Sequence, residues 1–588
     1  MVAFRAAKST ENTLLLDRHQ TPQHLWCVAC RKSALSPELA AADLNRPPDC
    51  DANSPSPHSA VALFSGMAAP TPAPWDSAAP KDQFFVLVTG ANSGIGLGIA
   101  ERLVDWFLTP RSPASHLILI TTTRSRQKSL QTTEALRDYV RKAVASNPTL
   151  RGRAGPSCDP ASVLTRIHLL SIQLDLCKLP TVHAATELLM RGPDGPPTEE
   201  DLRAGRIPAP IPRLDSIIFN AGIGGWSGLS WLSIPGAILK DGLIHQLTWP
   251  SFKISYVGNL VDPITGRALT SQQAAAEGLT RGELLGETFT ANIFGHYVFA
   301  HTLLPLLDRT REQLGAGGLA RGRVVWVGSV TPEPQDFSIS DFQGVASHDS
   351  YESTKRLADL LFLTAELPRV KPIVARYLTA DEATAVAAAA RNKGGKVADG
   401  NGGASPDVVP PRIYITHPGI VQTTIYHVPA LLVFWYGFAL YIARWIGSPW
   451  HPVKPYGGAV APVWCATEGQ EHLDSLGAER VKWGSSVSFW GKAAAKRTEV
   501  EGWGWDGRTA AEMAADQQYQ RQQRNEKRHW LRDRFGRKST AVDLKPEALQ
   551  DFEVLGAQCW EEMERLRLKW DEALGNGKPQ TNGRALAA

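Results

Sequence analysis

A tyrosine and a lysine four residues apart, Tyr351 and Lys355, have the types and spacing for acid–base chemistry. On a helix, residues four apart share one face, so the two side chains would be neighbours. A free tyrosine has a pKa of about 10 and is a poor acid at neutral pH. A neighbouring ammonium group favours the phenolate and lowers that pKa. We therefore expect Tyr351 to act as a general acid, with Lys355 lowering its pKa.

A glycine-rich turn earlier in the chain has the composition of a phosphate-binding loop. This turn, Thr89–Gly96, follows the apolar run Phe84–Val88 and precedes a helix-like stretch, Leu97–Phe107. Glycines let the backbone approach a pyrophosphate, and the free N–H groups that begin the next helix attract its charge. A dinucleotide beside an acid–base pair implies hydride transfer at a carbonyl or an alcohol. The residues expected to contact the dinucleotide in this turn are Gly90, Ser93, Gly94, Ile95 and Gly96.

The end of the second predicted strand indicates which dinucleotide is bound. Sites for NAD usually have an acid at this point, whereas sites for NADP have an arginine nearby for the 2′-phosphate. This chain has no acid there, and Thr123 is followed by Arg124, Arg126 and Lys128. We expect NADPH, bound by Thr123, Arg124 and Lys128; the other interpretation of these cations is an ordinary solvated loop.

Ser329 ends a further apolar run, Arg323–Gly328. In a doubly wound sheet, ligands bind at the carboxyl ends of the strands, so Ser329 could hydrogen-bond the same oxygen that Tyr351 protonates. The alternative for the tyrosine–lysine pair is a surface helix without a catalytic role, and the position of Ser329 weakens that alternative.

The order of apolar and helix-like stretches predicts the fold. Near-continuous apolar runs alternate with helical stretches, which is typical of a parallel sheet covered by helices on both faces. The chain therefore predicts an α/β, doubly wound parallel sheet of the Rossmann type. The predicted strands are Phe84–Thr89, Leu117–Thr123, Ile167–Leu174, Ser216–Phe219, Arg323–Gly328 and Arg412–Thr416. The polar insertions expected to be solvated surface loops are 191–213, 262–283, 311–322 and 379–411.

Three domains follow from composition. We expect residues 1–81 to be a disordered extension, and Met67 to be a plausible alternative start. Residues 82–507 form the predicted cofactor-binding domain, and 508–588 a charged helical tail. Within the middle domain, the apolar segment 428–446 is rich in tryptophan and tyrosine. It fits a buried lid helix, a helix dipping into a membrane or a true span, and its length alone does not decide between them.

Overall composition excludes several classes of protein. The net charge of +4 over 588 residues argues against a nucleic-acid partner. Seven scattered cysteines fit a reducing compartment better than a disulfide framework. Cys27 and Cys30 have zinc-ligand spacing, but no second pair follows them, so we expect no metal. The first twenty residues lack the apolar stretch of a secretory signal.

Further motifs make the chain similar to the short-chain dehydrogenase/reductases. The resemblance implies that Asp175 contacts adenine, and that Asn292 positions a water linking Lys355 to solvent. It also implies that Lys355, together with Tyr351, holds the nicotinamide ribose. The remaining residues that match cofactor-binding motifs of that family are Asn220, Ala221, Gly222, Pro418, Gly419, Val421 and Thr423.

A narrower resemblance is to the fungal 3-keto-steroid reductases of ergosterol biosynthesis. The segments that carry it are 248–253, 291–297, 351–357, 443–451 and 568–572. It implies NADPH-dependent reduction of a sterol 3-ketone, such as zymosterone or its 4-methyl analogue, to the 3β-alcohol during C-4 demethylation. It further implies the endoplasmic reticulum membrane or lipid droplets as the location, and the other C-4 demethylation enzymes and their scaffold as partners.

Two rival functions stay open at this point. The same catalytic set would serve a reductase of another lipid or steroid ketone. A protein of another class, a non-catalytic NADP(H) sensor or scaffold, would share the fold, since fold alone does not fix function. For a sterol substrate, Trp226, Trp231 and Trp249 could line an apolar pocket beside 428–446, or could simply be core aromatics.

Overall fold

The computed structural model of the chain describes ten stretches of residues, and Thr71–Ala588 forms one compact unit. The described stretches are 73–109, 114–146, 160–195, 198–230, 232–280, 282–379, 407–422, 430–515, 537 and 542–575. The candidate residues Thr423 and Trp231, the Cys27/Cys30 pair, Met67 and most of the insertion 379–411 lie outside them.

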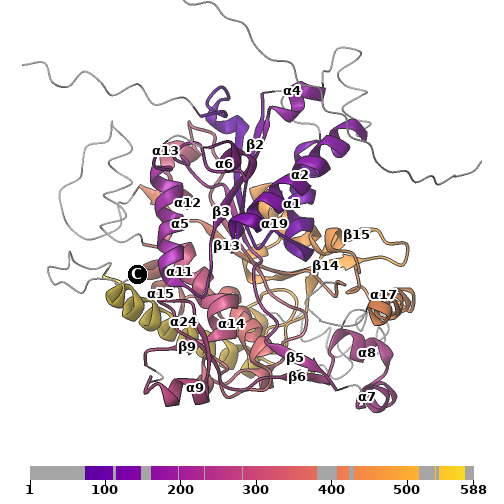
Figure 1. Cartoon of the computed structure of the whole chain (residues 1–588). Helices are drawn as coiled ribbons and strands as arrows, with labels where there is room; N and C mark the ends of the chain where they lie inside the picture. Colours follow the sequence, from indigo (N-terminus) through magenta and orange to yellow (C-terminus); the bar gives the residue numbers. More distant parts are fainter. Residues whose placement is uncertain are drawn as a thin grey trace, which may run out of the picture. The chain divides into compact units, whose positions relative to one another are not determined.

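A central eight-stranded sheet confirms the predicted doubly wound topology (Figure 1). Its strand order is β3-β2-β1-β4-β11-β13-β14-β15, and all strands but the last pair in parallel. The order reverses direction between β1 and β4, where such sheets bind their ligands. The strands are β1 (Gln83–Thr89), β2 (His116–Thr123), β3 (Ile167–Gln173), β4 (Ser216–Phe219), β11 (Arg323–Val327), β13 (Arg412–His417), β14 (Lys482–Val487) and β15 (Ala493–Thr498).

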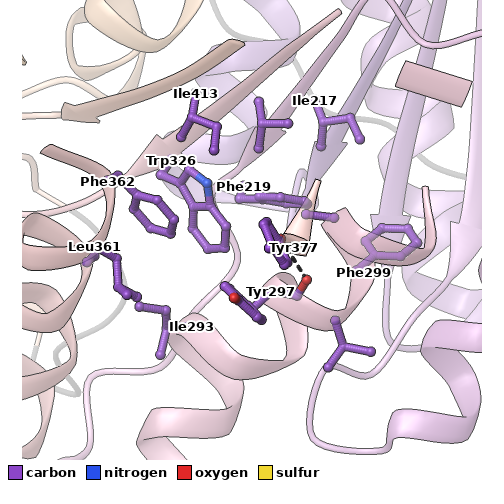
Figure 2. Packing of buried hydrophobic residues seen from close by; sticks show 14 of the residues in the cluster. Ile217, Phe219, Ile293, Tyr297, Phe299, Trp326, Leu361, Phe362, Tyr377 and Ile413 are labelled. Carbon is purple, nitrogen blue, oxygen red and sulfur yellow. Dashed lines mark hydrogen bonds between the residues drawn. The ribbon is translucent and has the colours of Figure 1, made fainter. Parts of the chain in front are cut away.

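Alternate residues along the strands form two separate apolar cores, one on each face of the sheet. Figure 2 shows the first core, where Phe219 and Trp326 of the sheet pack against Phe362 and Tyr297. Val88 belongs to the second core, on the opposite face. The helices around the first core are α5 (Leu179–Arg191), α11 (Gly295–Thr302) and α14 (Ser350–Thr364), and those around the second are α1 (Gly94–Phe107), α2 (Arg126–Ser146) and α19 (Val460–Thr467).

The charged C-terminal helix, expected as a tail, is part of the folded body. Helix α24 (Pro546–Ala573) packs along α14, and the Trp560 indole donates a hydrogen bond to the Leu361 carbonyl at 2.8 Å. The Tyr297 hydroxyl donates to the Glu564 carboxylate at 2.7 Å. Trp560 is fully buried. The apolar residues of α24 recur at helical spacing and belong to the first core, so this charged helix packs one apolar face on the body.

The described start of the chain and the insertions are also more ordered than we expected. Trp75, within the extension predicted to be disordered, is 1% exposed and packs edge-on against Phe85 at 5.6 Å. Ile207 and Ile211 of the insertion 191–213 are fully buried. The insertion 262–283 contains β8 (Ala268–Thr270) and α9 (Ser271–Ala276). A few apolar side chains in these insertions are buried against the body, so the expectation of fully solvated loops is wrong there. Overall polarity does not show where these few apolar residues pack.

The apolar segment forms helix α17 (Ala430–Trp445), which is 16 residues long. No helix among the described residues is both long enough and apolar enough to cross a bilayer. Leu440 and Ala443 are fully buried, whereas Phe434 and Trp435 are 67% and 57% exposed. The helix thus has one face against the protein and one aromatic face toward the surroundings.

Candidate active site

Ser329, Tyr351 and Lys355 meet at the carboxyl end of β11. Tyr351 lies in the first turn of α14 and hydrogen-bonds the Ser329 side chain, which follows β11 directly. The Lys355 amine lies 5.6 Å from the centre of the Tyr351 ring and donates to the Val327 carbonyl at 2.9 Å. The structure therefore brings together all three residues that the sequence proposed for proton transfer.

The pKa of Tyr351 differs from the sequence expectation. Burial raises the pKa of this phenol above its ordinary value, and the hydrogen bond with Ser329 opposes the rise. Burial, followed by repulsion from Lys482, lowers the pKa of Lys355 to about 8, while the Asp359 carboxylate acts in the other direction. The expected net lowering of the tyrosine pKa is thus wrong for this arrangement, because burial has the largest effect and the Lys355 amine donates to a backbone carbonyl and not to the phenol.

Asn292 joins the loop after β4 to the catalytic helix. It lies in a single π-helical turn, Thr290–Phe294, and its amide oxygen accepts from the Ile223 N–H at 2.7 Å. Its amide nitrogen donates to the Ile223 carbonyl at 3.0 Å and to the Thr354 hydroxyl at 3.3 Å. Asn292 therefore contacts the residue that precedes Lys355, and its hydrogen bonds fix the loop and the helix relative to each other.

The glycine turn after β1 forms a cradle that other residues could not form. Gly90 and Gly94 have φ of 67° and 54°, which favours glycine, and a Cβ on Gly96 would lie 2.2 Å from the Gly90 carbonyl. The Asn220 amide donates to the Thr89 carbonyl at 3.2 Å, which places the Asn-Ala-Gly motif after β4 beside this turn. Ser93 precedes α1 without a side-chain cap, so the N–H groups of its first turn are available to an anion.

The cations after β2 divide into two groups. Arg126 forms ion pairs with Glu200 and Asp201 of the insertion 191–213, at 3.2 and 3.0 Å. Arg124 and Lys128 are exposed. The Thr123 hydroxyl bonds Ser129 inside the fold at 2.7 Å, so it supports this loop rather than facing the surface.

Asp175 follows β3 at the same edge of the sheet. Its carboxylate accepts from the Cys177 N–H at 3.0 Å, and this bond fixes the turn that leads into α5. Ala221 and Gly222 follow Asn220 in the loop held by Asn292.

An apolar cavity of about 370 Å³ opens above Ser329 and Tyr351. Pro418, Gly419 and Val421, predicted to bind cofactor, lie in its wall together with Ile95. Apolar side chains from three helices form much of the remaining wall: α7 (Ile234–Asp241), α8 (Leu243–Thr248) and α17. Trp226 lines the cavity as proposed, whereas Trp249 is not part of the wall and donates from its indole to the Val330 carbonyl at 3.2 Å.

Two buried ion pairs near the site were not foreseen from the sequence. Lys253 of strand β6 (Lys253–Ser255) pairs with Glu352, the residue after Tyr351. Lys482 of β14 pairs with Asp359 of α14 at 2.7 Å. The sequence offers one signal for the second pair: Asp359 comes four residues after Lys355, so the two lie on the same face of α14. Nothing in the sequence connects Lys253 with Glu352.

The chain is similar over most of its length to fungal proteins named 3-keto-steroid reductase. No family model matches the chain. The 3-keto-steroid reductase ERG27 of Gibberella zeae is 44% identical over 509 residues, covering 86% of this chain and 98% of that protein. The enzyme of the same name from Aspergillus fumigatus is 35% identical, covering 85% and 97%.

More distant relatives and solved structures show lower similarity. The 3-keto-steroid reductase erg27 of Schizosaccharomyces pombe is 25% identical and covers 71% of this chain and 90% of that protein. The Pseudomonas aeruginosa RhlG/NADP active-site complex is 15% identical, covers 67% of this chain and 91% of that chain, and gives a TM-score of 0.29. That score is too low to support an inference.

Proposed function

Since this chain belongs to the 3-keto-steroid reductase family, we propose that it reduces a sterol 3-ketone to the 3β-alcohol with NADPH, in the C-4 demethylation steps of ergosterol biosynthesis. One observation carries the proposal: Ser329 and Tyr351 line an apolar cavity, and the Lys355 amine lies 5.6 Å from the centre of the Tyr351 ring. A sterol is almost wholly apolar with one polar oxygen, and the wall of this cavity is mostly apolar, with the Ser329 and Tyr351 hydroxyls among its few polar groups.

The residues around the glycine turn fit a bound dinucleotide. Any side chain at Gly96 would collide with the Gly90 carbonyl, so the turn keeps a backbone surface free of Cβ atoms where a pyrophosphate can approach. Exposed Arg124 and Lys128 supply positive charge for the 2′-phosphate of NADPH. When bound, NADPH supplies the hydride. The other residues proposed to hold it are Ser93, Gly94, Ile95, Thr123, Asp175, Asn220, Ala221, Gly222, Pro418, Gly419, Val421 and Thr423.

Tyr351 is the proposed proton donor to the ketone oxygen. Its raised pKa keeps the phenol protonated at neutral pH, which a donor for reduction requires. The Ser329 hydroxyl donates a hydrogen bond to the same oxygen and polarises the carbonyl. The Lys355 ammonium stabilises the phenolate as it forms, and Asn292 holds the loop and helix that position Lys355.

An exposed apolar surface next to the cavity supports membrane contact. Trp435 both lines the cavity and is 57% exposed, so the cavity and the outer surface are continuous at α17. Leu239 of α7 and Phe438 of α17 are 88% and 45% exposed. Trp490, in the turn between β14 and β15, is 88% exposed, and the adjacent Gly491 lies against the Arg444 guanidinium of α17. Large exposed apolar patches of this kind mark protein or membrane contacts.

We further propose that this patch, formed by Leu239, Trp435, Phe438 and Trp490, lies on a membrane and receives the sterol from it. The wild-type protein is expected to sediment with phosphatidylcholine vesicles, and the double variant Phe438→Glu/Trp490→Glu is expected not to. The control variant Leu568→Glu, which changes an exposed residue of α24, should sediment like the wild type. Equal sedimentation of all three proteins would refute the surface. On the family resemblance we propose the endoplasmic reticulum membrane or lipid droplets as the location, and the other C-4 demethylation enzymes and their scaffold as partners.

Incubation of membrane-reconstituted protein with NADPH and a sterol 3-ketone tests the proposed reaction. We expect the 3β-alcohol, followed by mass spectrometry, to form only with NADPH. Tyr351→Phe is expected to remove most turnover and leave NADPH binding nearly intact. No product despite intact cofactor binding would favour another lipid ketone as substrate. No turnover across a panel of ketones would favour the sensor.

A further inference from the structure

The cavity wall facing Tyr351 comes from a small two-stranded antiparallel sheet, β5 (Trp226–Leu229) paired with β6. The Trp226 ring lies against the Tyr351 ring, with 4.8 Å between their centres and 55° between their planes. The proposed proton donor therefore contacts a residue of the β5–β6 sheet. The position of that sheet affects the direction of the phenol.

Lys253 of β6 connects this wall to the catalytic helix. Its amine forms an ion pair with the Glu352 carboxylate, and both side chains are 7% exposed. The same amine lies 4.9 Å from the centre of the Trp226 ring, within range of a cation–π contact. Glu352 is adjacent to Tyr351 in the chain, so one lysine contacts both neighbours of the catalytic ring.

Lys253 is also the one charged side chain among the described residues that line the cavity. A lysine in an apolar cavity could instead bind an anionic group on a ligand. Here the charge is already compensated by Glu352, and the Asp336 and Asp349 carboxylates add further negative potential around it. The cavity therefore presents little net positive charge to an anion, which favours a role in holding the protein's own groups.

We propose that Lys253 is a positioning residue for the reduction. By binding both Glu352 and the face of Trp226, it holds the β5–β6 sheet against α14 and keeps the Tyr351 phenol directed at the ketone. This inference rests on the proposed function. A misdirected donor slows the chemical step, whereas much of the apolar wall comes from α7, α8 and α17 and does not contain Lys253. Lys253 should therefore act on kcat and not on KM.

The test is a set of three variants assayed with NADPH and a sterol 3-ketone. Lys253→Met is expected to lower kcat by about tenfold, with KM within about twofold of wild type. Lys253→Arg, which keeps both the ion pair and the cation–π contact, is expected to retain kcat within about threefold. Lys371→Met is the matched control, because it removes an exposed lysine paired with Glu366 on another helix, and it should leave both constants unchanged.

Urea unfolding and NADPH titration establish that each variant is folded and binds cofactor. Where Lys253→Met does not fold, the double variant Lys253→Met/Glu352→Gln, which leaves no unpaired carboxylate buried, takes its place with the same expectations. Wild-type kcat in the methionine variant, a loss confined to KM, or no rescue by arginine would each overturn the positioning role. Absence of product with the wild-type protein would instead count against the proposed function.

Discussion

Removal of the Asp359 charge is the perturbation whose effect the structure defines best. Asp359 is 0% exposed, its partner Lys482 is 3% exposed, and their charged atoms are 2.7 Å apart. The Arg356 guanidinium and the Lys355 amine lie close enough to act on the pKa of Asp359. Asp359→Asn therefore leaves several buried cations without their shared carboxylate, while it changes the side-chain volume very little.

The magnitude follows from the separation and the burial. Two unit charges 2.7 Å apart attract by about 6 kcal/mol at an effective dielectric constant of about 20, and desolvation of both groups offsets much of this. Loss of one partner from a buried pair typically costs about 3–5 kcal/mol, because the other charge stays buried without compensation. We expect Asp359→Asn to lower the free energy of unfolding by that amount.

Urea denaturation at neutral pH measures the loss, with two matched variants beside it. Glu366→Gln breaks an exposed pair with Lys371 and should cost about 0–1 kcal/mol. The double variant Asp359→Leu/Lys482→Met leaves neither member of the pair charged and should be more stable than Asp359→Asn. A loss below about 1 kcal/mol for Asp359→Asn, or a double variant no more stable than the single one, would refute the assignment of a buried, mutually dependent pair.

Four further predictions concern the site and the core. The kcat for reduction should fall as pH rises through about 8, because Lys355 then loses its proton. Lys253 also has a pKa of about 8, so the same pH profile is measured with Lys253→Arg. A fall in kcat that persists in this variant would be assigned to Lys355. Since both lysines have folded-state pKa values below the unfolded value, unfolding takes up protons between about 8 and 10.5, and urea midpoints should rise with pH across that window. Gly96→Ala should abolish NADPH binding in a fluorescence titration, because its Cβ would lie 2.2 Å from a backbone carbonyl, and an unchanged Kd would contradict the cradle. Trp560→Ala should destabilise the protein to urea by about 3–5 kcal/mol, against less than about 0.5 kcal/mol for exposed Leu568→Ala, and equal losses would contradict the packing of α24.

Local sequence patterns were sufficient for six of the eight strands, all but β14 and β15, and for the residues at the carboxyl edge of the sheet. Each predicted strand is present with ends within one residue, since continuous apolar runs have few alternatives to a buried parallel strand. Ser329 and Tyr351 meet as expected, because parallel strands and the helices that follow them have nearly fixed geometry.

Contacts between distant segments could not be predicted in the same way. Asp359 and Lys482 are 123 positions apart, and Lys253 and Glu352 are 99 apart, so no periodicity links the partners. The direction of the Tyr351 pKa shift was missed for a related reason. Desolvation depends on everything packed around the phenol, whereas spacing along one helix shows only the neighbouring amine.

The packing of α24 on α14 also has a consequence for the newly made chain. Synthesis proceeds from the N-terminus, so Tyr351 and Lys355 emerge long before Trp560, which covers the back of their helix. At about 5–20 residues per second, the interval between the two helices is on the order of ten to forty seconds. During that time the apolar back of α14 lacks its cover and is open to chaperones or to aggregation. A premature stop before α24 or within it would therefore be expected to damage catalysis while every proposed catalytic and cofactor-binding residue is still present.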